Sequence, residues 1–514
     1  MVSLKIRTSM NIQVKIRKVV IPFAIFLIVL PIFLFGLDQE IFAWDESLHV
    51  SRGIKGVNLL VHGVIGGDEW KFYITNEGKV QKGIITLANI IMGVGPWLNG
   101  VKSGGWIGNV EPPRYILFSS RAMVAVLGAI TCVVMYYLGR ELGGFMTGLI
   151  ASFILAFNPL WLLMSRLALR DMPSAFFSTT SILFFFCSIK RKKFNAKVSF
   201  LTISGITMGL ALGSKPLAGV AFLTIAVYLL MILTINDYRI FRTKSLSKNG
   251  REALICLLIF IPLSILFYFA SLPSLWKDPK SMLQMIPGII HQGTSTFKEK
   301  QEIAHVVHFN VPRDMLAAAT GILNFVLWPL FKPTPLVHFP TCLTWFGRFL
   351  NCYNTLPALF FFFAGITYFT LIWTKKKLSK IEILTLMWFT ITIAGLSWWI
   401  PVFWHRYCLQ LIPPTVLIET MGLNYLLQGI SKKMKYFFAG VALIIHAGFT
   451  ITGLPRVSWY SLQGLFKNNI GLILTIIFVL SMFFIIIPKI RLILGRDIPS
   501  QHQRNIGKEY YENK

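Results

Sequence analysis

The sequence predicts an all-α integral membrane protein with about twelve transmembrane helices. Of its 514 residues, 55% are hydrophobic and only 14% are charged, whereas soluble domains carry roughly 25% charged residues. The apolar residues also form charge-free runs of about 17–22 residues, the length of a membrane-crossing helix. Because a chain within lipid must satisfy its own backbone polar groups, these runs are predicted to be helical.

The predicted spans follow one another along most of the chain. They lie at about 19–37, 116–138, 144–164, 172–189, 198–214, 217–235, 253–271, 355–374, 382–400, 407–426, 436–453 and 470–488. A basic segment, 1–18, precedes the first span, which is predicted to remain uncleaved because no small-residue cleavage site follows it. Segments 1–18 and 489–514 are predicted to be cytoplasmic tails.

The positive charge of the chain predicts its orientation. Lys and Arg number 50 against 21 Asp and Glu, a net charge of +29. They cluster in short loops between apolar runs, which is typical of topology determinants and predicts no nucleic-acid partner. With the N-terminus in the cytoplasm, every predicted inner loop is basic: Arg140, 190–193, 239–251, 375–380, 432–435 and 489–496. Both termini are therefore predicted to be cytoplasmic.

Two predicted outer loops are long, 38–115 and 272–354. In the first, an apolar helix lying in the membrane interface is predicted from residues at helical spacing: Ile84, Leu87, Ile91, Val94 and Leu98. The second contains an apolar stretch, 315–331, that ends before Pro333. This stretch is predicted to be an interfacial helix, a re-entrant helix or a pair of half-spans.

Ionisable residues next to membrane spans are candidates for function. Three groups lie on the predicted outer side: Trp44-Asp45-Glu46, Arg166 with Arg170-Asp171-Met172-Pro173, and Gly209–Pro216 with Lys215. Each group also has a structural interpretation. The first group could be solvated loop carboxylates, the second an Arg–Asp pair at a helix start, and the third a lysine that extends to the interface.

The order of these motifs resembles that of the GT-C class, polytopic glycosyltransferases that use a polyprenyl-phosphate sugar donor. The class includes protein O-mannosyltransferases and aminoarabinose transferases of lipid A. The resemblance covers about 19–425 and includes, besides the three groups, Arg121, Gly139–Gly144, Asn158-Pro159, Trp276-Lys277-Asp278-Pro279, His405-Arg406-Tyr407 and Pro413-Pro414. The chain departs from the class at 77–82, where relatives often carry His-Pro-Pro or Lys-Pro-Pro. Residues 19–488 are accordingly predicted to form one GT-C-like catalytic domain.

The resemblance implies a role for each candidate residue. Asp45 would be the general base of an inverting displacement, Glu46 would orient the acceptor or Asp45, and Asp171 would be the second acidic group. The donor phosphate would be held by cations: Lys215, Arg406, Arg170 and Arg166, with Lys82 and His291 as secondary candidates. The implied partners are a polyprenyl-phosphate-linked sugar and an acceptor protein, lipid or glycan. A divalent cation beside Asp45 is compatible with this chemistry but is not required by it.

Two other functions fit a polytopic chain. A transporter would use intramembrane charges as a solute path, usually with inverted repeats and charges near the midplane. The sequence shows no such repeat, and its charged motifs fall at one predicted face. A non-enzymatic scaffold would tolerate changes of Asp45 and Lys215. The sequence does not indicate the sugar, the acceptor, the polyprenol or the oligomeric state.

Overall fold

The computed structural model describes residues 19–39, 43–273, 276, 356–399 and 405–453, with gaps at 65, 67, 77–78, 105, 107–109, 238–247 and 376–377. Several predictions lie outside the described residues. These are the two tails, the span at 470–488, the apolar stretch at 315–331 and nearly all of the second outer loop.

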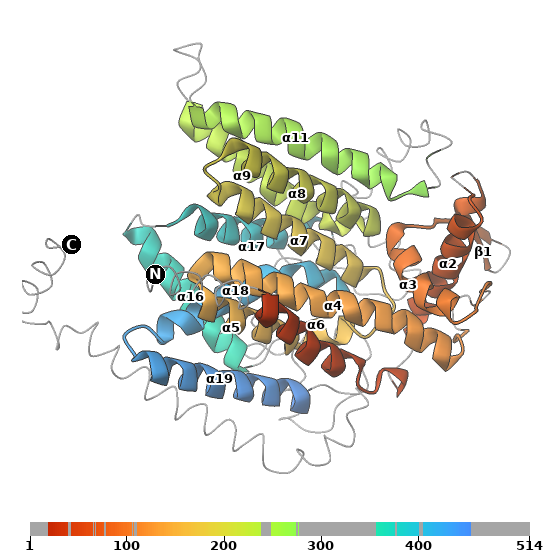
Figure 1. Cartoon of the computed structure of the whole chain (residues 1–514), viewed down its shortest axis with the longest axis horizontal. Coiled ribbons are helices and arrows are strands. Elements are labelled where there is room, and N and C mark those ends of the chain that lie inside the picture. Colours follow the sequence, from red (N-terminus) through yellow and green to blue (C-terminus); the bar gives the residue numbers. More distant parts are fainter. Residues whose placement is uncertain are drawn as a thin grey trace, which may run out of the picture.

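The described chain forms a bundle of long apolar helices (Figure 1). Seven are long and apolar enough to cross a membrane: α4 (Arg114–Gly143), α7 (Asp171–Lys190), α8 (Phe194–Ser214), α9 (Gly219–Asp237), α11 (Lys248–Ala270), α16 (Leu356–Thr374) and α17 (Lys380–Trp399). Shorter or less apolar helices complete the bundle: Val19–Leu34, α5 (Phe145–Ala156), α18 (Ile412–Leu426) and α19 (Lys432–Gly453). The multi-pass helical class is confirmed, and the total of twelve spans stays a prediction.

Two predicted spans are interrupted. The span at 144–164 divides into α5 and α6 (Pro159–Met164). The Asn158 side chain accepts a hydrogen bond from the backbone N–H of Trp161 at 3.1 Å, and Pro159 occupies the first helical position. Both features start a new helix. The span at 407–426 begins instead as a 3₁₀ helix, η6 (His405–Leu411), which is followed by α18.

A small subdomain follows the first helix. It contains η1 (Leu37–Gln39), α2 (Trp44–Val61), η2 (Asp68–Trp70), α3 (Leu87–Leu98) and an antiparallel hairpin of β1 (Lys71–Asn76) and β2 (Lys79–Ile84). In the hairpin, Lys71 lies opposite Ile84 and Asn76 opposite Lys79. Helix α3 confirms the helix predicted in this loop. The all-α class is confirmed, and helix α2 and the short hairpin are additions that were not predicted.

Glycines let α2 and α3 cross in close contact. A Cβ atom on Gly53 would lie 2.2 Å from the carbonyl oxygen of Asn89, and one on Gly93 would lie 2.0 Å from the carbonyl carbon of Gly53. No side chain fits at such distances, because the interior is already close-packed. The crossing fixes α2, whose first turn carries Asp45, against α3.

The subdomain lies at one end of the bundle (Figure 1). The backbone N–H of Leu87 at the start of α3 donates to the carbonyl oxygen of Ser271, just after α11, at 3.2 Å. Basic residues of the predicted inner loops occupy the opposite ends of the same helices: Lys190 ends α7, Lys248 begins α11 and Lys380 begins α17. One end is therefore rich in lysine and the other carries the subdomain.

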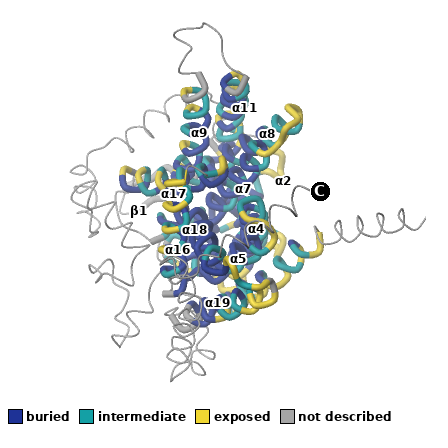
Figure 2. The backbone as a smooth tube through the Cα atoms, turned by 90° about the vertical axis from the view of Figure 1, so that its left-hand side faces the viewer, coloured by how far each residue is buried: buried dark blue, intermediate teal, exposed yellow. Residues whose placement is uncertain are grey.

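Buried residues gather on α5, α7 and α18 in the middle of the molecule (Figure 2). Every residue of α18 from Ile412 to Leu423 is buried. Close helix contacts support this core, since a Cβ atom on Gly422 would lie 1.9 Å from the carbonyl oxygen of Phe361 in α16. Interiors packed in this way resist displacement, so the helix ends that carry the site are held in fixed positions.

Candidate active site

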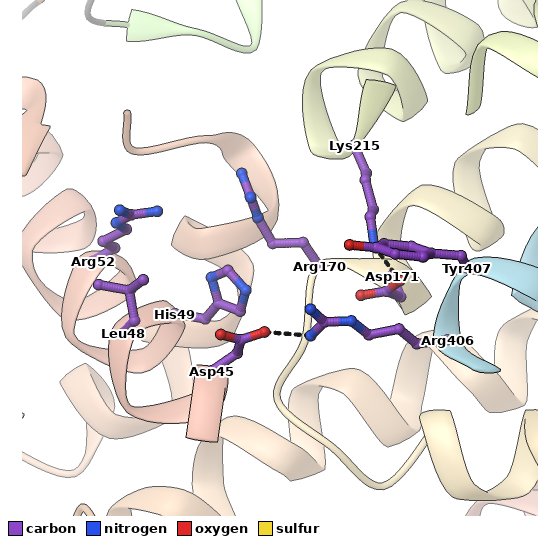
Figure 3. Close-up of a pocket in the computed structure, with 9 residues that line it drawn as sticks. All are labelled: Asp45, Leu48, His49, Arg52, Arg170, Asp171, Lys215, Arg406 and Tyr407. Carbon is purple, nitrogen blue, oxygen red and sulfur yellow. Dashed lines mark hydrogen bonds and ion pairs between the residues drawn. The ribbon is translucent and has the colours of Figure 1, made fainter. Parts of the chain in front are cut away.

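A pocket opens where the subdomain meets the bundle (Figure 3). Its volume is about 180 Å³. Four separate segments supply its lining residues: Asp45, Leu48, His49 and Arg52 from α2, Arg170 and Asp171 from the start of α7, Lys215 from the end of α8, and Arg406 and Tyr407 from η6. Five residues that the sequence analysis selected therefore meet in one space.

One wall of the pocket is a single face of α2. Asp45, Leu48, His49 and Arg52 are spaced by three, one and three residues, which places them on the same side of a helix. Asp45 lies in the first turn, where the helix dipole favours a negative charge. Its side chain is 24% exposed and can be reached from the pocket.

The opposite wall joins two helix ends and η6. Asp171 is the first residue of α7, and its carboxylate pairs with the ammonium of Lys215, which follows α8 directly. The Lys215 ammonium also lies 4.3 Å from the centre of the Tyr407 ring, a cation–π distance. Arg406 pairs across the pocket with Asp45 (Figure 3). The two walls are thus connected by an ion pair.

Positive charge exceeds negative charge in the pocket. Four cations (Arg52, Arg170, Lys215 and Arg406) face two carboxylates, a surplus of two positive charges. The Arg170 Nε atom is buried and has no hydrogen-bond partner among the described residues. A charge that is buried without full pairing is costly, so the pocket is suited to an anionic ligand such as a phosphate group.

Burial lowers the pKa of two lining residues. Burial lowers the pKa of Lys215 to about 8, although the nearby carboxylate of Asp171 favours its charged form. For His49, burial acts first and the surrounding cations, Arg170 foremost, act in the same direction. Together they lower the pKa of the imidazole well below its usual 6.5. His49 is therefore neutral at physiological pH.

Glu46 does not lie in the pocket, although the resemblance gave it a role beside the acceptor. Its fully buried carboxylate accepts two hydrogen bonds from Arg121, at 2.8 and 2.7 Å. It also accepts from the backbone N–H groups of Ala43 at 2.8 Å and Ala168 at 2.7 Å. Glu46 thus joins the start of α2 to α4 and to the segment before α7. These bonds fix the first turn of α2, which carries Asp45.

Arg166 also lies outside the pocket. Its guanidinium donates to the carbonyl oxygens of Phe33, Phe35 and Gly36, at 3.1, 2.7 and 3.1 Å. These carbonyls belong to the end of the first helix, where backbone acceptors lack partners within the helix. The predicted phosphate contact of Arg166 is not supported by this placement, because the arginine is committed to capping that helix.

The secondary candidates stay predictions. Lys82 lies in β2, and its side chain is outside the described part of the structure, as is all of His291.

The sequence analysis did not select His49 or Arg52, because the helix that carries them was not predicted. Helical spacing of four and seven residues from Asp45 is the signal that could have found them. Within the described residues, no group of three or more His, Cys, Asp or Glu side chains could hold a metal ion.

The sequence and the fold are similar to those of known membrane glycosyltransferases. Residues 68–276 match the sequence model of the dolichyl-phosphate-mannose-protein mannosyltransferase family. No curated protein sequence matches the chain. Among solved structures, the archaeal oligosaccharyltransferase AglB from Archaeoglobus fulgidus, in complex with an inhibitory peptide and a dolichol-phosphate, has a TM-score of 0.53 and 15% identity. The chain has the GT-C fold.

Two further structures show the same kind of likeness. The Archaeoglobus fulgidus oligosaccharyltransferase in complex with zinc and sulfate has a TM-score of 0.50 and 16% identity. The match covers 85% of this chain and 54% of that oligosaccharyltransferase. ArnT from Cupriavidus metallidurans in the apo state has a TM-score of 0.46 and 14% identity. The match covers 92% of this chain and 76% of ArnT. AglB covers 87% of this chain, which spans 57% of AglB. The GT-C fold that the resemblance implied is confirmed.

Proposed function

We propose that this GT-C chain moves a sugar from a polyprenyl-phosphate donor to a hydroxyl group of a protein, lipid or glycan acceptor. The observation that carries the proposal is the pocket in which two carboxylates and four cations converge from separate segments. Displacement at an anomeric carbon needs a base for the attacking hydroxyl and cations for the departing phosphate. The pocket offers both within one small volume.

The charge balance supports a phosphate leaving group. A sugar–phosphate–lipid diester carries one negative charge, whereas a released phosphate monoester carries about −1.5 to −2 at pH 7. The pocket has a surplus of two positive charges. It therefore complements the leaving group better than the intact donor, which is the condition for accelerating the chemical step. Arg170 and Arg406 provide fork-shaped donors and Lys215 a point charge.

Asp45 is the proposed general base. Its carboxylate would accept the proton of the acceptor hydroxyl as that oxygen attacks the sugar, and it would stabilise positive charge on the ring. In the structure, Asp45 is paired with Arg406, and Asp171 with Lys215. A bound phosphate would compete for both cations and release Asp45 for proton transfer. One base with direct displacement inverts the anomeric configuration.

The proposed active-site face is the outer one. The pocket lies at the start of α7 and the end of α8, whereas the lysine-rich segment 190–193 follows the far end of α7. Cytoplasmic loops of membrane proteins carry an excess of Lys and Arg. This charge distribution supports a pocket on the side away from the cytoplasm, with both termini inside.

The proposal is tested with membranes that contain the chain, supplied with labelled polyprenyl phosphates that carry mannose, glucose or aminoarabinose. Mannose comes first because of the family match. We expect label in a peptide, lipid or glycan fraction, with inverted anomeric configuration, only in membranes that contain the chain. If no donor gives transfer and none binds, the proposal is wrong. Translocation of the labelled lipid without transfer would favour a transporter.

Lys215→Ala is expected to weaken donor binding more than acceptor binding. The Lys215 side chain is 16% exposed and lines the pocket. Loss of a charged hydrogen bond costs about 1.5–3 kcal/mol, which corresponds to a roughly 10- to 150-fold loss of affinity. Equilibrium binding of polyprenyl phosphate and the KM for the acceptor provide the measurement. Equal effects on both partners would reject the phosphate assignment.

The affinity for polyprenyl phosphate should also depend on pH. Since burial lowers the pKa of Lys215 to about 8, the free protein loses this positive charge as the pH rises through that value. Affinity should therefore fall as the pH rises above 8. Lys215→Arg is the matched control, because a guanidinium stays charged over this range. A decline at the same pH in the arginine variant would assign the titration to another group.

A further inference from the structure

His49 is held in one tautomer by a chain of hydrogen bonds from α3. The backbone N–H of Thr86, which can only donate, gives its proton to Asn89 Oδ1 at 3.2 Å, and the Thr86 hydroxyl donates to the same oxygen at 3.0 Å. These bonds fix which end of the Asn89 amide is oxygen. The amide nitrogen Nδ2 therefore faces His49 Nδ1, at 3.2 Å.

The amide nitrogen carries two protons and cannot accept a hydrogen bond. His49 Nδ1 must accept one, so the single proton of the neutral imidazole lies on Nε2. Asn89 also donates to the His49 carbonyl oxygen at 3.4 Å, which ties the amide to the helix that carries the ring. Asn89 is fully buried and His49 is 7% exposed, so water does not compete strongly for these bonds.

His49 thus presents a neutral N–H donor to the pocket. His49 lines the pocket and its Nδ1 edge is occupied by Asn89, so Nε2 is the ring nitrogen left to meet a ligand. The ring lies one helical turn from Asp45 on the same wall (Figure 3). Four cations line this pocket and are suited to the anionic part of the ligand. An uncharged donor beside the proposed base matches the uncharged part of the ligand.

The geometry points to His49 as a specificity-determining residue whose Nε2–H donates to a hydroxyl oxygen of the transferred sugar, with Asn89 as the positioning residue that fixes the tautomer. This inference rests on the proposed function, since it needs a sugar bound between Asp45 and the phosphate cations. His49 does not act as the base, because Nε2 already carries its proton. Leu48, on the same face, offers an apolar surface to the ring carbons of the sugar.

The test compares equilibrium binding of polyprenyl phosphate with that of its mannosyl and glucosyl diesters. In His49→Phe, affinity for the sugar-bearing lipid should fall about 3- to 10-fold, the effect of one neutral hydrogen bond, with affinity for the sugar-free lipid unchanged. His49→Gln, which carries an amide nitrogen near the position of Nε2, should restore most of the loss. Equal losses for both lipids, or no loss for either, would overturn the inference.

Asn89→Asp supplies a signature that a structural role would not give. A carboxylate at this position accepts from Nδ1, so the neutral ring loses its Nε2 proton. Preference for the sugar-bearing lipid should vanish at high pH and return at low pH, where the ring carries both protons. The wild type should show no such step. A pH-independent preference in Asn89→Asp contradicts the tautomer assignment.

The two proposals fail in different ways. If the wild type binds neither the sugar-free lipid nor the diesters, the proposed function is wrong. If the wild type binds polyprenyl phosphate but does not distinguish it from either diester, only the assignment of His49 to the sugar is wrong. A rise in the KM for the acceptor in His49→Phe, with donor binding intact, would also overturn that assignment and move the contact to the acceptor.

Discussion

Asp45→Asn is expected to lower the rate of sugar transfer by about 10²- to 10⁴-fold, the usual contribution of a positioned general base. Asparagine has nearly the same shape as aspartate, so the fold should persist. It cannot accept the proton of the acceptor hydroxyl, and it does not stabilise positive charge on the sugar ring. The measurement is single-turnover transfer from labelled donor by purified protein. Turnover like that of the wild type would exclude Asp45 as the base.

The same variant should keep its affinity for polyprenyl phosphate or bind it several-fold more tightly. The Asp45 carboxylate is the ion-pair partner of Arg406. Removing that charge leaves Arg406 available and raises the positive surplus of the pocket. Asp38→Asn is the matched control, because Asp38 is an exposed carboxylate in η1, outside the pocket. It should change neither transfer nor binding.

Loss of both transfer and lipid binding in Asp45→Asn would have another meaning. It would indicate that the Asp45–Arg406 pair shapes the phosphate site, and that the carboxylate is structural. The separation of rate from affinity is therefore the outcome that distinguishes a base from a support. The same comparison distinguishes a transferase from a transporter. In a transporter, the rate and the affinity are both expected to change with solute binding.

The sequence predicted the bundle well because membrane spans have a strong and simple signal. Long apolar runs bounded by lysine-rich loops leave few alternatives in lipid. Asn158-Pro159 is a typical start of a helix. The break there was not predicted because the residues on both sides are apolar and were assigned to one span. Helix α2 was missed because it begins with charged residues and contains Gly53 and Gly56. Its stability comes from packing on α3, which single-sequence propensity does not report.

Five of the predicted site residues meet in the pocket, two lie elsewhere, and the side chains of Lys82 and His291 lie outside the described part of the structure. Asp45, Asp171, Lys215, Arg406 and Arg170 line it. Glu46 and Arg166 are buried elsewhere in bonds to distant segments. The sequence alone does not show which of two neighbouring residues of the same charge points into a site. The direction of each side chain depends on the helix on which it lies, and α2 turns Asp45 and Glu46 to different sides.

Glu46→Ala is expected to destabilise the chain by about 3–5 kcal/mol, the cost of removing one partner of a buried ion pair. Arg121 would remain 1% exposed without its carboxylate, and the N–H groups of Ala43 and Ala168 would lose their acceptor. The measurement is the free energy of unfolding in mixed micelles. Glu46→Gln keeps an acceptor oxygen but loses the charge, so its loss should be smaller.

Glu141→Ala is the matched control for this effect. Glu141 also pairs with basic residues, Lys190 at 3.1 Å and Arg140 at 3.8 Å, but its side chain is 24% exposed. Partly exposed pairs contribute about 0–1 kcal/mol, so this variant should unfold almost as the wild type does. If Glu46→Ala instead left stability intact and lowered only the acceptor kcat/KM, Glu46 would be a ligand contact. Its bonds to α4 and to the segment before α7 would then be secondary. A loss of stability in the Glu46 variants but not in Glu141→Ala would show that the buried bonds of Glu46 hold Asp45 in position.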